Sequence, residues 1–179
     1  MKSIVRSFLF AGLLLIGRIA EAAEAPAVFQ VSELSFTRPS TWEWVDTAGG
    51  MRKAQLSVPD AAKKQKAEVV FFHFGPGGAG GVKANVDRWI GQFQEPREQL
   101  KPKIEETTVG KHKVTYVKAE GTYSSGMPGG PKTPLANHGL LGAIIEADQG
   151  SVFVRLTGPA ALAKSSESEF KKMVESGLK

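Results

Sequence analysis

The sequence predicts an α+β fold in which two helices pack on a mainly antiparallel sheet. Short segments of alternating apolar and polar residues follow one another along the chain, and most are joined by residues typical of hairpin turns. Only two segments carry apolar residues at helical spacing, and the regular βαβαβ alternation of a doubly wound fold is missing. A length of 179 residues fits a single domain.

Alternation predicts short strands at residues 29–31, 34–36, 42–44 and 54–58. In the third of these, Trp42 and Trp44 are two residues apart, so both indoles should lie on one face. Residues 68–74 are apolar on both faces, which is typical of a central strand that is covered on both sides.

The second half of the chain predicts two hairpins and the two helices. The mid-chain helix follows a glycine-rich loop, and its apolar positions are Val82, Val86, Trp89, Ile90 and Phe93. The hairpins pair residues 104–109 with 113–119 and residues 140–147 with 152–156. Residues 121–138 are rich in glycine and proline and predict a long loop. Ser166 and Glu169 form a capping box that predicts the start of the last helix.

Residues 1–22 have the pattern of a secretory signal peptide. Two basic residues precede an apolar run from Phe8 to Ile16, and a small-x-small cleavage site ends at Ala22. A membrane helix is the alternative, but the apolar run is about half the roughly 20 residues that a span needs. We therefore expect cleavage near Ala23, one domain over residues 23–179, no transmembrane span after cleavage, and a periplasmic or secreted location.

The composition excludes several classes of protein. The chain has no cysteine, so it has no disulfide scaffold, thiol nucleophile, zinc–cysteine cluster or lipidated cysteine. Residues 1–22 carry three basic residues and one acidic residue, so their removal lowers the net charge from +5 to +3. The remaining lysines are spread along the chain, whereas a nucleic-acid site needs a denser basic patch. The three histidines share no metal-ligand spacing. We expect no nucleic-acid partner, no metal and no cofactor.

No catalytic signature stands out in the sequence. Ser124 and Ser125 lack the G-x-S-x-G elbow of serine hydrolases. Glu105 and Glu106 are neighbours on a predicted strand and point to opposite faces, which is wrong for an acid–base pair. Residues 75–80 match G-x-G-x-x-G, but a hairpin follows where a dinucleotide-binding fold needs a parallel strand. Whether the protein is an enzyme stays open, and a non-catalytic role is favoured.

One local feature is a candidate ligand site, at the junction of the glycine-rich loop and the mid-chain helix. The candidate residues are Gly80, Gly81, Lys83, Asn85 and Arg88. Free amides at a helix N-terminus, with Lys83 in the first turn, suit a phosphate or a carboxylate. The alternative is a loop that only lets the chain turn tightly. Asn85, Arg88 and Gln92 form a polar stripe that either faces a ligand or, as we favour, packs along the sheet.

The late hairpin resembles a known superfamily, which contains the extrinsic photosystem II subunit P and the nuclear Ran-release factor. The resemblance rests on residues 140–146 and 152–159, on the helix containing residues 170–173 and Ser176, and on Phe36-Thr-Arg-Pro39 with Trp42 near the start. It implies an α/β/α sandwich around a mainly antiparallel sheet. The members are mainly binding and assembly proteins, so the resemblance also implies a non-catalytic function.

A second resemblance is to exported bacterial proteins of unknown function. The shared features are Phe74-Gly75, a glycine-rich loop, Asn85, Arg88-Trp89 and Gln92-Phe93. Two functions therefore stay open. The first is an exported, non-catalytic binding or assembly module for an unknown protein. The second is a small-molecule binder for an anionic ligand, or an enzyme, that uses a cleft around loop 75–81. An enzyme needs convergent titratable groups, whereas an interaction module needs an exposed apolar patch.

Overall fold

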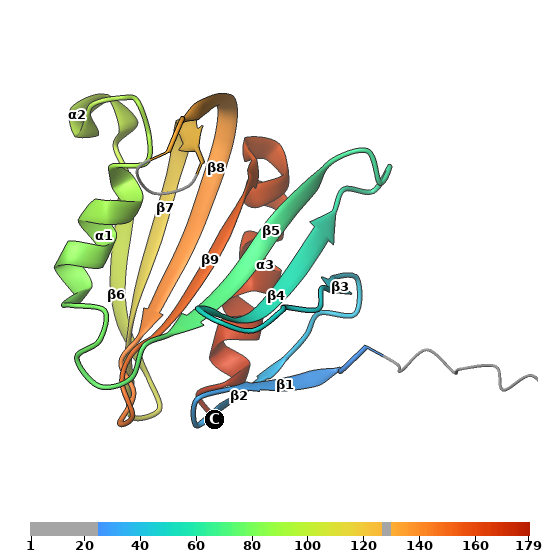
Figure 1. Ribbon diagram of the computed structural model, residues 1–179, viewed down its shortest axis with the longest axis vertical. Coiled ribbons are helices and arrows are strands. Elements are labelled where there is room, and N and C mark those ends of the chain that lie inside the picture. The colour runs from blue at the N-terminus through green and yellow to red at the C-terminus, as the bar shows by residue number, and fades with distance from the viewer. Residues whose placement is uncertain (1–24, 127–129) are drawn as a thin grey trace, which may run out of the picture.

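A seven-stranded antiparallel sheet forms the centre of the protein (Figure 1). The computed structural model describes residues 25–126 and 130–179, and the predicted signal peptide, residues 1–22, lies outside them. The strands are β1 Val28–Val31, β2 Leu34–Thr37, β3 Glu43–Trp44, β4 Arg52–Pro59, β5 Lys66–His73, β6 Lys103–Val109, β7 His112–Ser125, β8 Thr133–Ile145 and β9 Val152–Pro159. The helices are α1 Val82–Ile90, α2 Arg97–Leu100 and α3 Ala160–Ser176. The main sheet has the order β3-β4-β5-β9-β8-β7-β6, and β1 pairs with β2 in a separate hairpin.

Each face of the sheet has its own apolar core, because alternate residues of a strand point to opposite faces. On β8, Leu141 and Ile145 pack in the cluster that includes α3, whereas Leu140 and Ile144 pack in the cluster that includes α1. Helices therefore cover both faces, and the predicted α/β/α sandwich is confirmed.

The strongest strand predictions are also confirmed. Ala54, Leu56 and Val58 are buried along one face of β4. Residues 69–71 of β5 are all buried, so this strand is covered on both faces. Both predicted hairpins form, as β6–β7 and β8–β9. Trp42 and Trp44 both pack in the α3-side core, as their spacing predicts.

The prediction of a long loop over residues 121–138 is wrong. Strand β7 runs on to Ser125 and β8 begins at Thr133, so most of this segment forms the outer half of a long hairpin. A register shift lies between Gly121 and Tyr123, where the Glu95 carboxylate accepts a hydrogen bond from the Thr122 amide. Glycine and proline favour a loop when judged from sequence, but here backbone pairing and a bulge accommodate them.

The capping box at Ser166 is also a wrong prediction. Helix α3 begins at Ala160, directly after β9, and its N-cap residue Pro159 makes no side-chain cap hydrogen bond. Ser166 lies inside the helix and is buried. The helix starts early because strand β9 leads straight into it. The short side chains of Ala160 and Ala163 then pack closely against β8: a Cβ added at Gly139 would lie 2.7 Å from the Ala163 Cβ. No helix in the described part of the chain is long and apolar enough to cross a membrane.

Candidate functional site

The predicted glycine-rich loop connects β5 to α1 and is folded by its glycines. Gly75, Gly77 and Gly80 all have positive φ angles, between 69° and 76°, which other residues adopt only with strain. Gly78 donates its amide to the Gly75 carbonyl and closes a turn. These positive φ angles let the backbone turn from the end of β5 to the start of α1 within a few residues.

Asn85 fixes the end of this loop from inside α1. Its side chain is buried, and Nδ2 donates to the carbonyl oxygens of Ala79 and Gly81, each at 3.0 Å. Its Oδ1 accepts a hydrogen bond of 2.7 Å from Arg88 Nη1. Arg88, which is exposed, thus supports the amide that holds the loop.

The two cations of the candidate anion site have separate partners. Lys83 Nζ lies 2.6 Å from Asp87 Oδ2, and Arg97 pairs with the other oxygen of the same carboxylate at 2.9 Å. Hydrogen bonds from Lys83 and Arg97 lower the pKa of Asp87. The structure thus brings Asn85 together with Arg88 but directs Lys83 to Asp87. An anion site at Gly80 and Gly81 stays a prediction.

A different cluster, centred on Arg155, lies on the α1 face of the sheet beside the residues that α1 covers. Register places Gln55, Val70, Arg155, Gly142 and Val117 side by side in one row across five strands. Trp89 of α1 covers this row at Gly142, where an added Cβ would lie 2.3 Å from the indole. Arg155, the next residue in the row, therefore lies beside the part of the sheet that Trp89 covers.

Arg155 is half-buried and incompletely bonded. Its guanidinium lies over the Phe72 ring, with Cζ 5.8 Å from the ring centroid, and Nη1 donates to Gln92 Oε1 at 3.2 Å. Its Nε is buried and finds no hydrogen-bond partner in the described part of the chain. None of the ion pairs among the described residues includes Arg155. Arg155 is thus a partly buried cation that forms no ion pair with any of the described residues.

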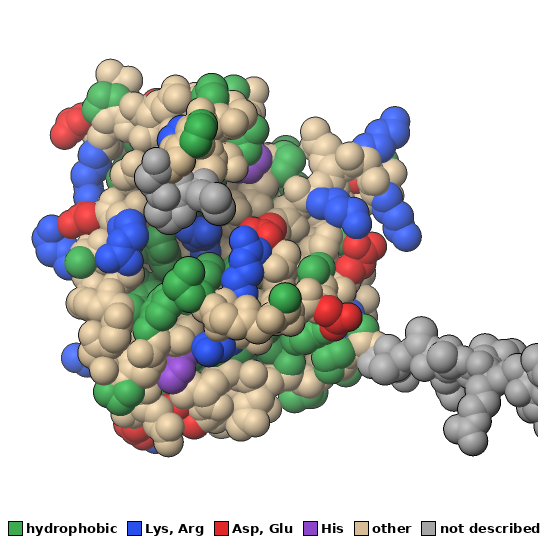
Figure 2. All heavy atoms as spheres, in the orientation of Figure 1, with side chains coloured by type: hydrophobic (Ala, Val, Ile, Leu, Met, Phe, Trp, Pro, Cys, Tyr) green, Lys and Arg blue, Asp and Glu red, His purple; other side chains and the backbone are tan. Residues whose placement is uncertain are grey.

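The groups that contact Arg155 are aromatic or neutral, and Glu68, a carboxylate on the same face of the paired strand β5, forms its ion pair with Arg52. Tyr123 Oη donates to the same Gln92 oxygen at 2.5 Å, and burial raises the pKa of Tyr123, so its hydroxyl stays neutral. Phe72 stacks on Phe74 at a centroid distance of 6.3 Å, and Phe74 is 42% exposed. We call Phe72, Phe74, Gln92, Tyr123 and Arg155 the Arg155 patch. Figure 2, a view of the whole molecule, shows hydrophobic side chains over the central strands with Lys and Arg side chains around them.

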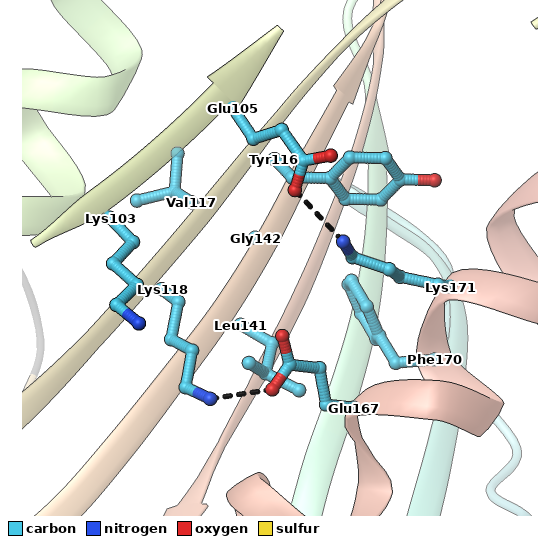
Figure 3. Close-up of a pocket in the computed structure, with 10 residues that line it drawn as sticks. All are labelled: Lys103, Glu105, Tyr116, Val117, Lys118, Leu141, Gly142, Glu167, Phe170 and Lys171. Carbon is cyan, nitrogen blue, oxygen red and sulfur yellow. Dashed lines mark hydrogen bonds and ion pairs between the residues drawn. The ribbon is translucent and has the colours of Figure 1, made fainter. Parts of the chain in front are cut away.

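A small cavity lies on the opposite face, between α3 and strands β6, β7 and β8 (Figure 3). Its volume is about 70 Å³. Two ion pairs connect the sheet to α3 beside it: Lys118 with Glu167 at 2.5 Å, and Lys171 with Glu105 at 2.9 Å. Leu141 and Phe170 supply apolar walls.

The histidines do not form a common site. His73 Nε2 lies 2.9 Å from the Gln149 carbonyl oxygen, and His112 Nδ1 lies 3.1 Å from that of Glu146. His138 stacks on Tyr123 at the edge of the Arg155 patch. Among the described residues, no group of three or more His, Asp or Glu side chains is placed to hold a metal ion.

Sequence reasoning named Gln92 only as part of a helical stripe and missed Arg155 and Tyr123. A signal for Arg155 exists, because it is the one charged residue in the apolar strand segment from Val152 to Leu156. Its partners come from other strands and from the segment after α1, and their proximity depends on the strand order. Tyr123 was hidden by the prediction of a loop.

Comparison with solved structures confirms the fold. The chain is similar to the solution structure of cyanobacterial PsbP (CyanoP) from Synechocystis sp. PCC 6803, with a TM-score of 0.50 and 11% sequence identity, over 88% of this chain and 95% of that one. It also matches PA94 from Pseudomonas aeruginosa, a protein of unknown function described as a putative regulator, with a TM-score of 0.44 and 14% identity over 83% and 92% of the chains. No family model and no curated protein sequence matches the chain. The protein has a PsbP-like fold.

Proposed function

We propose that the protein is an exported, non-catalytic binding module that holds a partner presenting a carboxylate beside an apolar group. The binding surface is the Arg155 patch. The observation that carries this proposal is the half-buried guanidinium of Arg155, which lies over Phe72 and has, among the residues that the structure describes, no partner for Nε and no carboxylate paired to it. Export rests on the signal-peptide pattern of residues 1–22.

The electrostatics of Arg155 favour an anionic partner. Burying a charge is costly unless it is paired and hydrogen-bonded, and the described part of the chain gives Arg155 one hydrogen bond to a neutral amide and one aromatic face. A guanidinium offers several donors in a fixed plane that matches a carboxylate. A carboxylate of a partner would therefore supply the ion pair and hydrogen bonds that the Arg155 guanidinium lacks among the described residues.

Phe74 supplies the apolar part of the surface. It is one of the exposed large hydrophobic residues among those described, it stacks on Phe72, and it directly precedes the glycine-rich loop in the sequence. Its ring also contacts Phe153 at 6.1 Å, so the exposed side chain is held by packing. Aromatic and arginine side chains are the types enriched at protein interfaces and among their energetic hot spots.

The chemistry of the neighbours supports binding over catalysis. Gln92 and the phenylalanines carry no transferable proton, and burial raises the pKa of Tyr123. The side chains in contact with Arg155 can thus orient a bound group but offer no acid–base pair.

The experiment is affinity capture with mature protein, residues 23–179, from the periplasm of its own organism, followed by quantitative mass spectrometry. We expect a discrete set of captured proteins with wild type, and at least a tenfold loss of that set with Arg155→Gln and with Phe74→Ser. Lys164→Gln, an exposed lysine on α3, is the matched control and should capture as wild type does. Equal capture by Arg155→Gln and wild type would contradict the proposal.

A further inference from the structure

The cavity beneath α3 has an excess of positive charge at its mouth. Three lysines line it, Lys103, Lys118 and Lys171, against two carboxylates, Glu105 and Glu167. Lys171 pairs with Glu105, and Lys118 pairs with Glu167. No ion pair or hydrogen bond of the described residues uses the Lys103 ammonium. One cation at the mouth thus has no counter-ion.

The position of Lys103 makes this charge more costly. Register places Lys103 of β6 directly opposite Lys118 of β7. Like charges directly opposite each other on neighbouring strands are destabilising. In Figure 3 the two side chains extend from adjacent strands toward the same side of the cavity. Glu167 neutralises Lys118 alone, so the pair keeps a net positive charge.

The interior of the cavity is apolar and firmly held. Leu141 and Phe170 are buried, and the Tyr116 ring forms another wall. The Lys171 ammonium lies 5.0 Å from the centroid of that ring while it pairs with Glu105, so the wall is fixed from α3. The site therefore combines a cationic mouth with a preformed apolar floor.

We propose that this cavity binds a small aliphatic monocarboxylate. The carboxylate lies between the ammonium groups of Lys103 and Lys118, and the short alkyl part lies against Leu141 and Phe170. A bound carboxylate would reduce the electrostatic repulsion between Lys103 and Lys118, so these two lysines would serve to bind the anion. A volume of about 70 Å³ exceeds the space of a single water several-fold and is well below that of an aromatic ring, so it suits a chain of about two to four carbons.

This site is independent of the Arg155 patch. Lys103, Lys118 and Leu141 face α3, whereas Arg155 faces the α1 side of the sheet, so a substitution at one site leaves the other intact.

The test is a titration of ¹⁵N-labelled mature protein with sodium acetate, propionate and butyrate, and with chloride and phosphate at matched ionic strength. We expect saturable shifts of the Gly142 and Lys118 amides with propionate and only small, linear shifts with chloride. Lys103→Met should weaken propionate binding about tenfold, and Lys103→Arg should retain it. Lys113→Met, on the same strand as Lys118 but with its side chain on the other face, is the matched control and should bind as wild type does.

Two results would overturn the assignment. Identical shifts with propionate, phosphate and chloride would show only charge screening at the lysines. Saturation by phosphate without saturation by propionate would show an inorganic anion site and exclude the alkyl contact. The spectra report folding directly, and Lys103 is exposed, so a loss of binding in a folded Lys103→Met protein counts for the proposal.

Discussion

Asn85 joins the glycine-rich loop to α1 through a single buried amide. Its Nδ2 satisfies carbonyl oxygens of Ala79 and Gly81, and its Oδ1 accepts from Arg88. A buried polar group that loses its partner costs about 1–3 kcal/mol. The sequence places Asn85 in a polar stripe with Arg88 and Gln92, and such a stripe either faces a ligand or packs along the sheet. The sequence alone does not reveal that the side chain points back into its own loop.

We expect Asn85→Ala to lower the free energy of unfolding by about 1–3 kcal/mol, because the loop carbonyls and the Arg88 guanidinium lose a partner. Chemical denaturation at pH 7 measures this change. Lys83→Met, which removes a largely exposed ion pair one turn away, is the control and should change stability little. Equal effects of the two substitutions would contradict a structural role for Asn85.

We expect His138 to make the stability of the protein depend on pH. Burial lowers its pKa below the ordinary value of 6.5. The unfolded chain therefore takes up a proton at a higher pH than the folded protein, and stability falls as the pH drops below about 6.5. His138→Phe keeps a ring to stack on Tyr123 but does not titrate. We expect wild type to lose more stability than this variant between pH 7 and pH 5.5; parallel losses would rule out His138 as the cause.

At the scale of elements, alternation and helical spacing are enough to predict the hairpins, the central strand β5 and helix α1. The errors have physical causes. Residues 121–125 and 133–138 became strand because β7 and β8 pair beyond the apolar segment, and a bulge absorbs the glycine. The predicted start of α3 is seven residues late, because a tight strand-to-helix junction needs no side-chain cap. Strand order, which creates the Arg155 patch, is a property of pairing between distant segments.

Gly142 shows how closely α1 packs on the sheet. A Cβ at this position would lie 2.3 Å from Trp89 Cζ3, so the indole or the helix must shift. We expect Gly142→Ala to cost roughly 1–3 kcal/mol of stability through overpacking. Gly81→Ala, at an N-cap position with open space and a φ of −74°, should change stability by less than about 1 kcal/mol, because the poorer N-cap preference of Ala and the lower entropy of its unfolded chain oppose each other. Thermal unfolding of the two variants beside wild type decides this, and a Gly142→Ala protein as stable as Gly81→Ala would show that α1 packs loosely.

At the scale of the whole molecule, we expect export and cleavage of the N-terminal segment. The short apolar run and the small-x-small motif favour processing near Ala23. Intact mass spectrometry of protein recovered from the periplasm or medium should show a chain that begins within a few residues of Ala23. A product that keeps residues 1–22 and stays with the membrane fraction would contradict export as a released protein.

The central claim is that the protein binds its partner through the Arg155 patch, and photo-crosslinking in the living cell tests it most directly. A photoreactive phenylalanine replaces Phe74 in one strain and the exposed Lys164 of α3 in another. We predict a discrete adduct of higher mass from position 74, lost when Arg155→Gln is added, and no adduct from position 164. An adduct from position 164 alone, or one from position 74 that persists with Arg155→Gln, would contradict the claim.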